Sequence, residues 1–150
     1  MGDRVPAIRV LLLPKDTNAY GTIFGGVILS HIDLASAIEA RKIAPHHYVT
    51  KAMREVEFHE PVHLGDIVSF YTETVRVGRT SVTVRVLVEA ERWGEVPELG
   101  IRSAAARATG ESAAAEAAGA VVKVTEAEVV LVAIDASGRP VPVCPVPPQA

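Results

Sequence analysis

The amino-acid sequence predicts an α+β fold in which an antiparallel sheet curls round one long helix. Three observations predict it: an apolar run at 25–43 with little alternation, β-rich runs on both sides of it, and an alternating hairpin at 67–91. The 150 residues, 49% of them hydrophobic and 22% charged, suit a single globular domain that covers 1–150. We therefore expect one helix packed against one sheet.

The first strand is expected at 4–13, where β-branched and aliphatic residues precede Pro14. A turn-rich stretch leads from there to the helix expected at 25–43. Basic residues near the end of this run suit the negative end of a helix dipole, and Pro45 stops the helix. The first half of the helix is apolar on most faces, which predicts that a sheet covers it.

The remaining strands are expected at 48–58, 67–77, 80–91 and 121–134. In the third of these, the valines at 82, 84, 86 and 88 fall on one face, and a tight turn at Gly78-Arg79 joins it to the strand before. An Ala-rich insertion at about 94–120, with ten alanines in 101–120, is expected to be a loop or a marginal helix. A Pro-rich extended tail is expected at 139–150.

Composition argues against several classes of protein. The net charge of -3 disfavours a nucleic-acid binder with a basic surface. The single cysteine, Cys144, excludes an intrachain disulfide and suits a reducing compartment. The N-terminus has no secretory pattern, and no segment reaches the roughly 18 apolar residues of a membrane-spanning helix. We expect a cytoplasmic protein.

The stretch that opens the helix carries the candidate site. Asp33 is a lone acid in an apolar run, and a partly desolvated carboxyl there suits a general base or a nucleophile. The N–H groups of Gly25 and Gly26 can stabilise an oxyanion at the start of the helix. From the residues alone, Asp33 can instead be a solvated acid, the glycines can serve close packing, and Asn18 can form an Asx turn or an N-cap.

Five segments, in order along the chain, resemble the hotdog-fold acyl-CoA thioesterases, in the branch of the YciA-like and brain-type acyl-CoA hydrolases. They are N-x-x-G-x-x-F-G-G at 18–26 with Asp33 beyond it, V-T at 49–50, F-x-x-P-V-x-x-G-D at 58–66, G-x-T-S at 78–81 and the closing strand with its tail at 125–142. The Ala-rich insertion departs from this pattern, because family members have a much shorter connection there.

The resemblance implies a hydrolase that splits acyl-CoA into free fatty acid and coenzyme A, with no metal and no cofactor. Asp33 would be the general base or the nucleophile, and Gly25 and Gly26 the oxyanion donors. Thr50 would supply a hydroxyl beside them. Asn18 would face Asp33 across a subunit interface, so that two subunits share each site.

The resemblance also implies that Arg79, Thr80 and Ser81 contact the pantetheine or the phosphates of the coenzyme, although a charged hairpin tip is commonly only solvated. It implies a homodimer, often assembled into a trimer of dimers, which is a hexamer. No partnership with nucleic acid or membrane is expected.

Two other functions fit parts of this pattern. A non-catalytic hotdog module would bind acyl-CoA as a sensor or assembly protein, but retention of Asn18 and Asp33 argues against it. A hotdog dehydratase would use an Asp–His pair, and no histidine follows Asp33 in the expected helix. The five histidines lack carboxylate or cysteine partners at ligand spacing, so no metal site is predicted.

Overall fold

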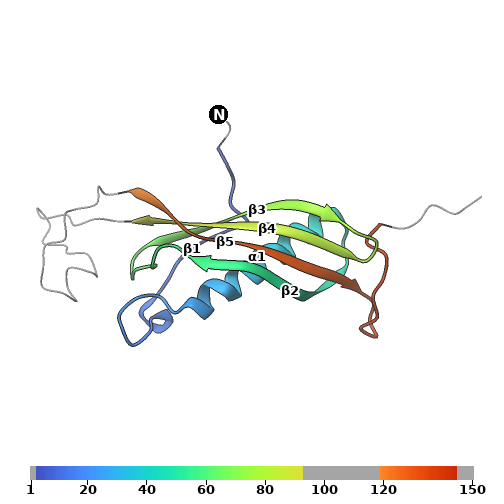
Figure 1. Cartoon of the computed structure of the whole chain (residues 1–150), viewed down its shortest axis with the longest axis horizontal. Coiled ribbons are helices and arrows are strands. Elements are labelled where there is room, and N and C mark those ends of the chain that lie inside the picture. Colours follow the sequence, from blue (N-terminus) through green and yellow to red (C-terminus); the bar gives the residue numbers. More distant parts are fainter. Residues whose placement is uncertain (1–2, 93–118, 145–150) are drawn as a thin grey trace, which may run out of the picture.

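The computed structural model describes residues 3–92 and 119–144, which form one antiparallel sheet and one long helix (Figure 1). In chain order the elements are β1 (Ile8–Leu11), the 3-10 helix η1 (Pro14–Asp16), α1 (Gly25–Ile43), β2 (His47–Phe58), β3 (Ile67–Val77), β4 (Ser81–Arg92) and β5 (Ala120–Ile134). The strand order is β1-β3-β4-β5-β2, and all neighbours are antiparallel. The α+β fold predicted from the sequence is confirmed.

The bounds of α1 agree with the sequence prediction, and β2 to β5 agree within one residue at each end. The first strand is shorter than the expected 4–13. Pro6 has no N–H to donate at its start, and at its end Leu12 turns into the core before Pro14 opens η1. Most of the Ala-rich insertion and the end of the tail lie outside the described residues.

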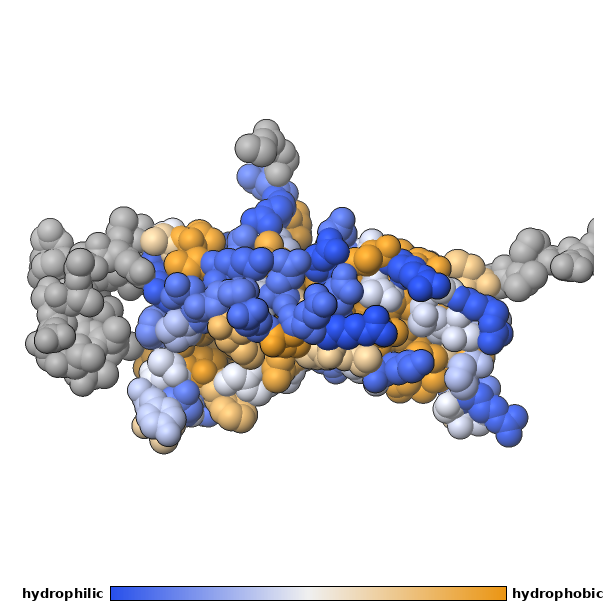
Figure 2. All heavy atoms as spheres, viewed as in Figure 1, coloured by the Kyte–Doolittle hydropathy of each residue, from blue (hydrophilic) through white to orange (hydrophobic). Residues whose placement is uncertain are grey.

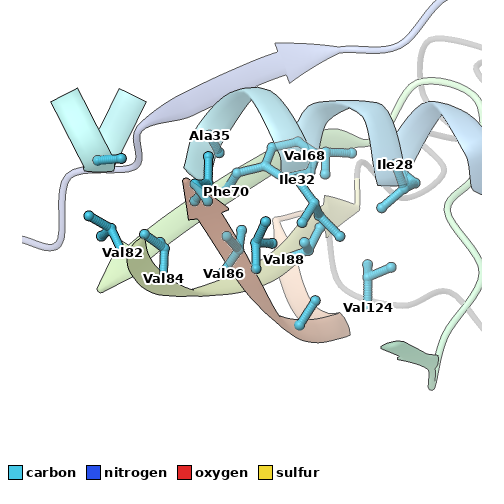
Figure 3. Close-up of a cluster of buried hydrophobic side chains, with 14 of the residues drawn as sticks. Ile28, Ile32, Ala35, Val68, Phe70, Val82, Val84, Val86, Val88 and Val124 are labelled. Atoms are coloured by element: carbon cyan, nitrogen blue, oxygen red, sulfur yellow. The ribbon is translucent and has the colours of Figure 1, made fainter. Parts of the chain in front are cut away.

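The core lies between α1 and the inner face of the sheet (Figure 3). The four valines of β4 are fully buried, as their alternation predicted. Ile28, Ile32 and Ala35 project from one face of α1 towards them, and Phe70 of β3 fills the space between. This packing fixes which face of the helix is left for a site.

The outer face of the sheet is charged. Arg85 at its centre contacts Glu73 on β3 at 3.4 Å and Glu128 on β5 at 3.3 Å, and both are its register partners. Figure 2 shows hydrophilic residues gathered over these strands. Antiparallel sheets commonly have one face packed on the core and one face exposed to solvent. The charged outer face is therefore not suited to binding an apolar ligand.

The sheet covers only one face of α1. Leu34 and Ile38, one turn apart, are 57% and 40% exposed, so the helix is less fully wrapped than its apolar composition predicted. A polar clamp fixes the helix to β3: Glu39 accepts hydrogen bonds from Thr72 Oγ1 at 3.0 Å and Thr74 Oγ1 at 3.1 Å. No helix in the described ranges has the length and apolarity needed to cross a membrane.

The described part of the segment after β5 folds back on the molecule, and the rest of the Pro-rich tail expected at 139–150 lies outside the described residues. Val143 is fully buried, and its N–H donates to the carbonyl of Arg79 at 2.9 Å. The His46 ring, just beyond α1, donates from Nε2 to the Val143 carbonyl at 2.8 Å. The chain therefore closes the end of the core that lies beyond the helix C-terminus.

Candidate active site

Two predicted residues meet at the middle of α1. Asp33 is half-buried on the helix, and the exposed Thr50 of β2 donates its hydroxyl hydrogen to Oδ1 of Asp33. The Ser36 hydroxyl donates a hydrogen bond to the backbone carbonyl of Asp33 at 2.7 Å, and not to its carboxylate. No residue in the described ranges donates a hydrogen bond to Oδ2, so this oxygen is available to a substrate or a water.

The start of α1 presents two N–H groups without acceptors. The N-cap residue, Phe24, makes no side-chain cap, and the first helical N–H to find a partner is that of Val27, which donates to the Phe24 carbonyl at 3.0 Å. Within the described residues, the N–H groups of Gly25 and Gly26 have no acceptor. Groups of this kind at a helix N-terminus attract negative charge.

Close packing does not require glycine at these two positions. A Cβ at Gly25 would lie in ordinary contact with the Phe58 ring, 3.7 Å from its Cζ. A Cβ at Gly26 would meet only the Phe24 ring, with Cε1 2.4 Å away, and Phe24 is 58% exposed and free to move. The packing explanation is therefore weak, and the exposed N–H groups become the more informative feature.

The two aromatic neighbours of the glycines were not among the predicted site residues. Phe24 precedes the helix directly, and Phe58 ends β2 and is 45% exposed. Both belong to the motifs quoted from the sequence, in which Phe24 directly precedes Gly25, but no local pattern there places Phe58 beside the same glycine. They place apolar surface on both sides of the polar helix start.

Asn18 forms an Asx turn, which was the structural alternative to a role in the site. Its Oδ1 accepts from the N–H of Tyr20 at 2.9 Å and of Thr22 at 3.2 Å, and its Nδ2 donates to Thr22 Oγ1 at 2.8 Å. Within one chain no described contact joins Asn18 to Asp33. A shared site would therefore need Asn18 from a second subunit.

The hairpin tip expected to contact the coenzyme lies at the other end of the helix. Gly78 N–H donates to the Ser81 carbonyl at 2.7 Å, and the carbonyls of Arg79 and Thr80 accept from the N–H groups of Val143 and Ala133. A helix of 19 residues is about 28 Å long. One chain therefore does not bring Arg79, Thr80 and Ser81 to its own Gly25 and Gly26.

No group of three metal-ligating side chains occurs in the part of the chain that the structure describes.

The geometry can be compared with known proteins. Residues 20–96 match the family described as the thioesterase superfamily. The chain belongs to this superfamily. A hexameric hotdog-fold thioesterase of Campylobacter jejuni has 37% sequence identity with this thioesterase-superfamily chain and a TM-score of 0.74, over 93% of this chain and 90% of that one. The fold is therefore the hotdog fold, as the resemblance implied.

The thioesterase-superfamily chain is also similar in sequence to acyl-CoA thioester hydrolases. The acyl-CoA thioester hydrolase YciA of Escherichia coli is 35% identical over 139 residues, which are 93% of this chain and 89% of the relative. An uncharacterized acyl-CoA thioester hydrolase of Haemophilus influenzae is 40% identical over 90 residues. That match covers 60% of this chain and spans 58% of the relative's length.

Proposed function

We propose that this chain hydrolyses acyl-CoA thioesters to free fatty acid and coenzyme A, the reaction class named for its relatives. The observation that carries the proposal is the contact of Asp33 with Thr50 on a helix whose first two N–H groups are free. A carboxylate and an oxyanion site are the two groups that acyl transfer requires. Asp33 lies seven residues beyond Gly26, about 10 Å along the helix, so the glycines that act together with Asp33 belong to a second subunit.

In the general-base route, Asp33 removes a proton from a water as the water oxygen attacks the thioester carbon. The carbonyl oxygen becomes an oxyanion and accepts hydrogen bonds from the N–H groups of Gly25 and Gly26 of the second subunit. The C–S bond then breaks, coenzyme A leaves as the thiolate, and the proton held by Asp33 is available to neutralise it. Thr50 holds Oδ1, so that Oδ2 faces the water.

In the nucleophilic route, an Asp33 carboxylate oxygen attacks the thioester carbon itself and expels the coenzyme A thiolate. The resulting mixed anhydride is hydrolysed by water, which regenerates Asp33 and releases the fatty acid. Both routes use the same contacts and need no metal or cofactor. Hydrolysis in ¹⁸O-labelled water identifies the nucleophilic route if the label enters Asp33 after a single turnover, which requires that water attacks the Asp33 carbonyl carbon of the anhydride.

The site is completed by Asn18 of a second subunit, because Asn18 does not reach Asp33 within its own chain. The Arg79–Ser81 hairpin that contacts the coenzyme would likewise belong to a different subunit from the glycines of the same site. The exposed Leu34 and Ile38 on the uncovered face of α1 support such pairing. The hexameric state of the Campylobacter jejuni relative supports a trimer of dimers.

The deciding experiment is a thiol-release assay over acyl-CoA substrates from acetyl to palmitoyl, with Asp33→Asn and Asp33→Ala as variants. We expect wild-type turnover and a loss of about a hundredfold or more in both variants. A folded Asp33→Ala variant that keeps near-full turnover would contradict the mechanism. A wild-type protein that binds acyl-CoA but releases no thiol would establish the binding-module alternative.

A further inference from the structure

A cavity of about 310 Å³ lies between the start of α1 and the end of β2. Its lining is mainly apolar, and consists of Ile23, Gly25, Ile28, Phe58, His59, Glu60, Pro61 and Val62. The two polar side chains are both exposed, whereas Ile23, Ile28 and Val62 are 6% exposed or less. The side chains in the buried part of the cavity can therefore pack against an apolar ligand, but they have no group that hydrogen-bonds to a polar one.

Phe58 differs from the floor residues because solvent still reaches its ring. It is 45% exposed, and its ring lies at van der Waals distance from the position of a Cβ on Gly25. The ring thus forms one wall of the cavity, and Phe58 can be replaced by a larger or smaller side chain without disturbing the core. No other large apolar side chain of the lining combines access to solvent with contact to the helix start.

The cavity is continuous with the proposed oxyanion site, because Gly25 belongs to both. A carbonyl oxygen that accepts from Gly25 N–H sits at the edge of this cavity, and the carbon chain attached to that carbonyl can enter it. The pantetheine arm, on the other side of the thioester, carries amides and a hydroxyl that need polar partners. Of the two substituents, the acyl chain is the one that the lining suits.

We infer that the cavity receives the acyl chain of the thioester and that Phe58 sets which chain lengths are accepted. The inference rests on the proposed hydrolysis and adds a residue that determines specificity. A cavity of limited volume gives each methylene that fits a favourable contribution, about fourfold in kcat/KM. Carbons that exceed the space contribute nothing or hinder binding.

The test varies the size of the side chain at position 58. Phe58→Trp fills the cavity, Phe58→Ala widens it, and Val75→Ala is the matched control, because Val75 is 43% exposed on β3 and lines no part of the cavity. The measured quantity is kcat/KM across straight-chain acyl-CoAs, divided by kcat/KM for acetyl-CoA. Circular dichroism and unfolding curves verify that each variant folds.

With Phe58→Trp we expect the ratio for chains near the wild-type optimum to fall by about tenfold or more. With Phe58→Ala the optimum moves towards longer or branched acyl groups. Val75→Ala keeps the wild-type profile. If both Phe58 variants fold and keep the wild-type profile, the inference is wrong, although hydrolysis itself stands.

A second readout does not depend on turnover. S-alkyl-coenzyme A thioethers of increasing length are titrated calorimetrically into wild-type protein and Phe58→Trp. Affinity that rises with chain length in the wild type and stops rising earlier in Phe58→Trp supports the inference; equal profiles overturn it. Because the thioethers are not hydrolysed, this outcome is separate from a failure of the proposed function, which would appear as no thiol release by the wild type.

Discussion

The hydroxyl of Thr50 donates a hydrogen bond to the carboxylate of Asp33 across 17 positions of sequence. Thr50 lies on the edge strand β2, and Asp33 lies near the middle of α1. The bond fixes one carboxylate oxygen and leaves the other for chemistry. The orientation of the proposed base therefore depends on how β2 lies along the helix.

Replacing Thr50 by valine keeps its shape and removes the hydroxyl. A hydrogen bond to a charged group contributes about 1.5–3 kcal/mol, so we expect kcat/KM to fall by about ten- to a hundredfold. Thr50→Ser restores the donor and should keep most of the activity. Steady-state thiol release measures both variants, and equal activity of the valine and serine variants would show that the hydroxyl does not orient Asp33.

Asn18→Asp separates the two possible roles of this residue. A carboxylate can accept the same bonds from the N–H groups of Tyr20 and Thr22, so the turn should persist, whereas the amide donor is lost. We expect unfolding midpoints close to wild type and a clear loss of thiol release. Asn18→Ala should lose turn stability as well, by about 1 kcal/mol.

Coexpression of Asn18→Asp and Asp33→Asn chains tests whether two subunits share one site. If they do, a mixed dimer contains one intact site, and random pairing restores about a quarter of wild-type activity. If both residues serve the same subunit's site, the mixture stays inactive. Differently tagged chains, purified as the mixed species, allow the two results to be read directly.

Gly26→Ala tests the start of the helix. The added Cβ displaces the exposed Phe24 ring and meets no backbone, so we expect the free energy of unfolding to change by less than about 1 kcal/mol. The displaced ring alters the surroundings of the free N–H groups, and kcat should fall while the fold is kept. An Ala variant with wild-type kcat would show that the position of the Phe24 ring beside these N–H groups does not affect catalysis.

Glu39 gives a prediction about acid stability. Partial burial favours the neutral acid, but hydrogen bonds from Lys42, Thr72 and Thr74 and the charge of Lys42 outweigh it, so the pKa of Glu39 lies below its usual 4.5. A lowered pKa in the folded state stabilises the protein above pH 4.5, and this contribution is lost as the pH falls through the folded-state value.

We therefore expect Glu39→Gln to lower the free energy of unfolding by about 1–3 kcal/mol at pH 7, and the difference from wild type to shrink below pH 4.5. Urea unfolding between pH 7 and pH 3 measures this. Glu73→Gln is the control, because the Glu73 side chain is 71% exposed in a 3.4 Å ion pair. A difference from wild type that is the same at every pH would contradict the assignment.

Local patterns in the sequence were enough to predict most elements. The alternation of Val82 to Val88 has the period of a strand with one buried face, and Pro45 ends a helix for a steric reason. These signals act within a few residues. They identified the hairpin of β3 and β4, but they reveal nothing about how the other strands are paired.

Such local patterns could not predict which strands pair when they lie far apart in the sequence. The strand β2 pairs with β5 rather than with β3, the next strand along the chain, and this pairing brings Thr50 opposite Leu131. A register shift between Arg54 and Glu57 gives Glu55 a φ of 53° and resets which side of β2 the following residues face. The contacts of Thr50 and the position of Phe58 both depend on this, so neither could be worked out from the residues alone.

The burial of Val143 has a practical consequence for anyone who wishes to shorten or label the protein. The last strand in the described residues, β5, ends at Ile134. The residues after it are nevertheless needed, because Val143 closes the core and its backbone hydrogen bonds link the hairpin at Arg79 to His46, which follows α1. Cutting the chain back to β5 would leave an apolar opening at that end. An affinity tag or a dye at this terminus should therefore be attached beyond Cys144, through a spacer.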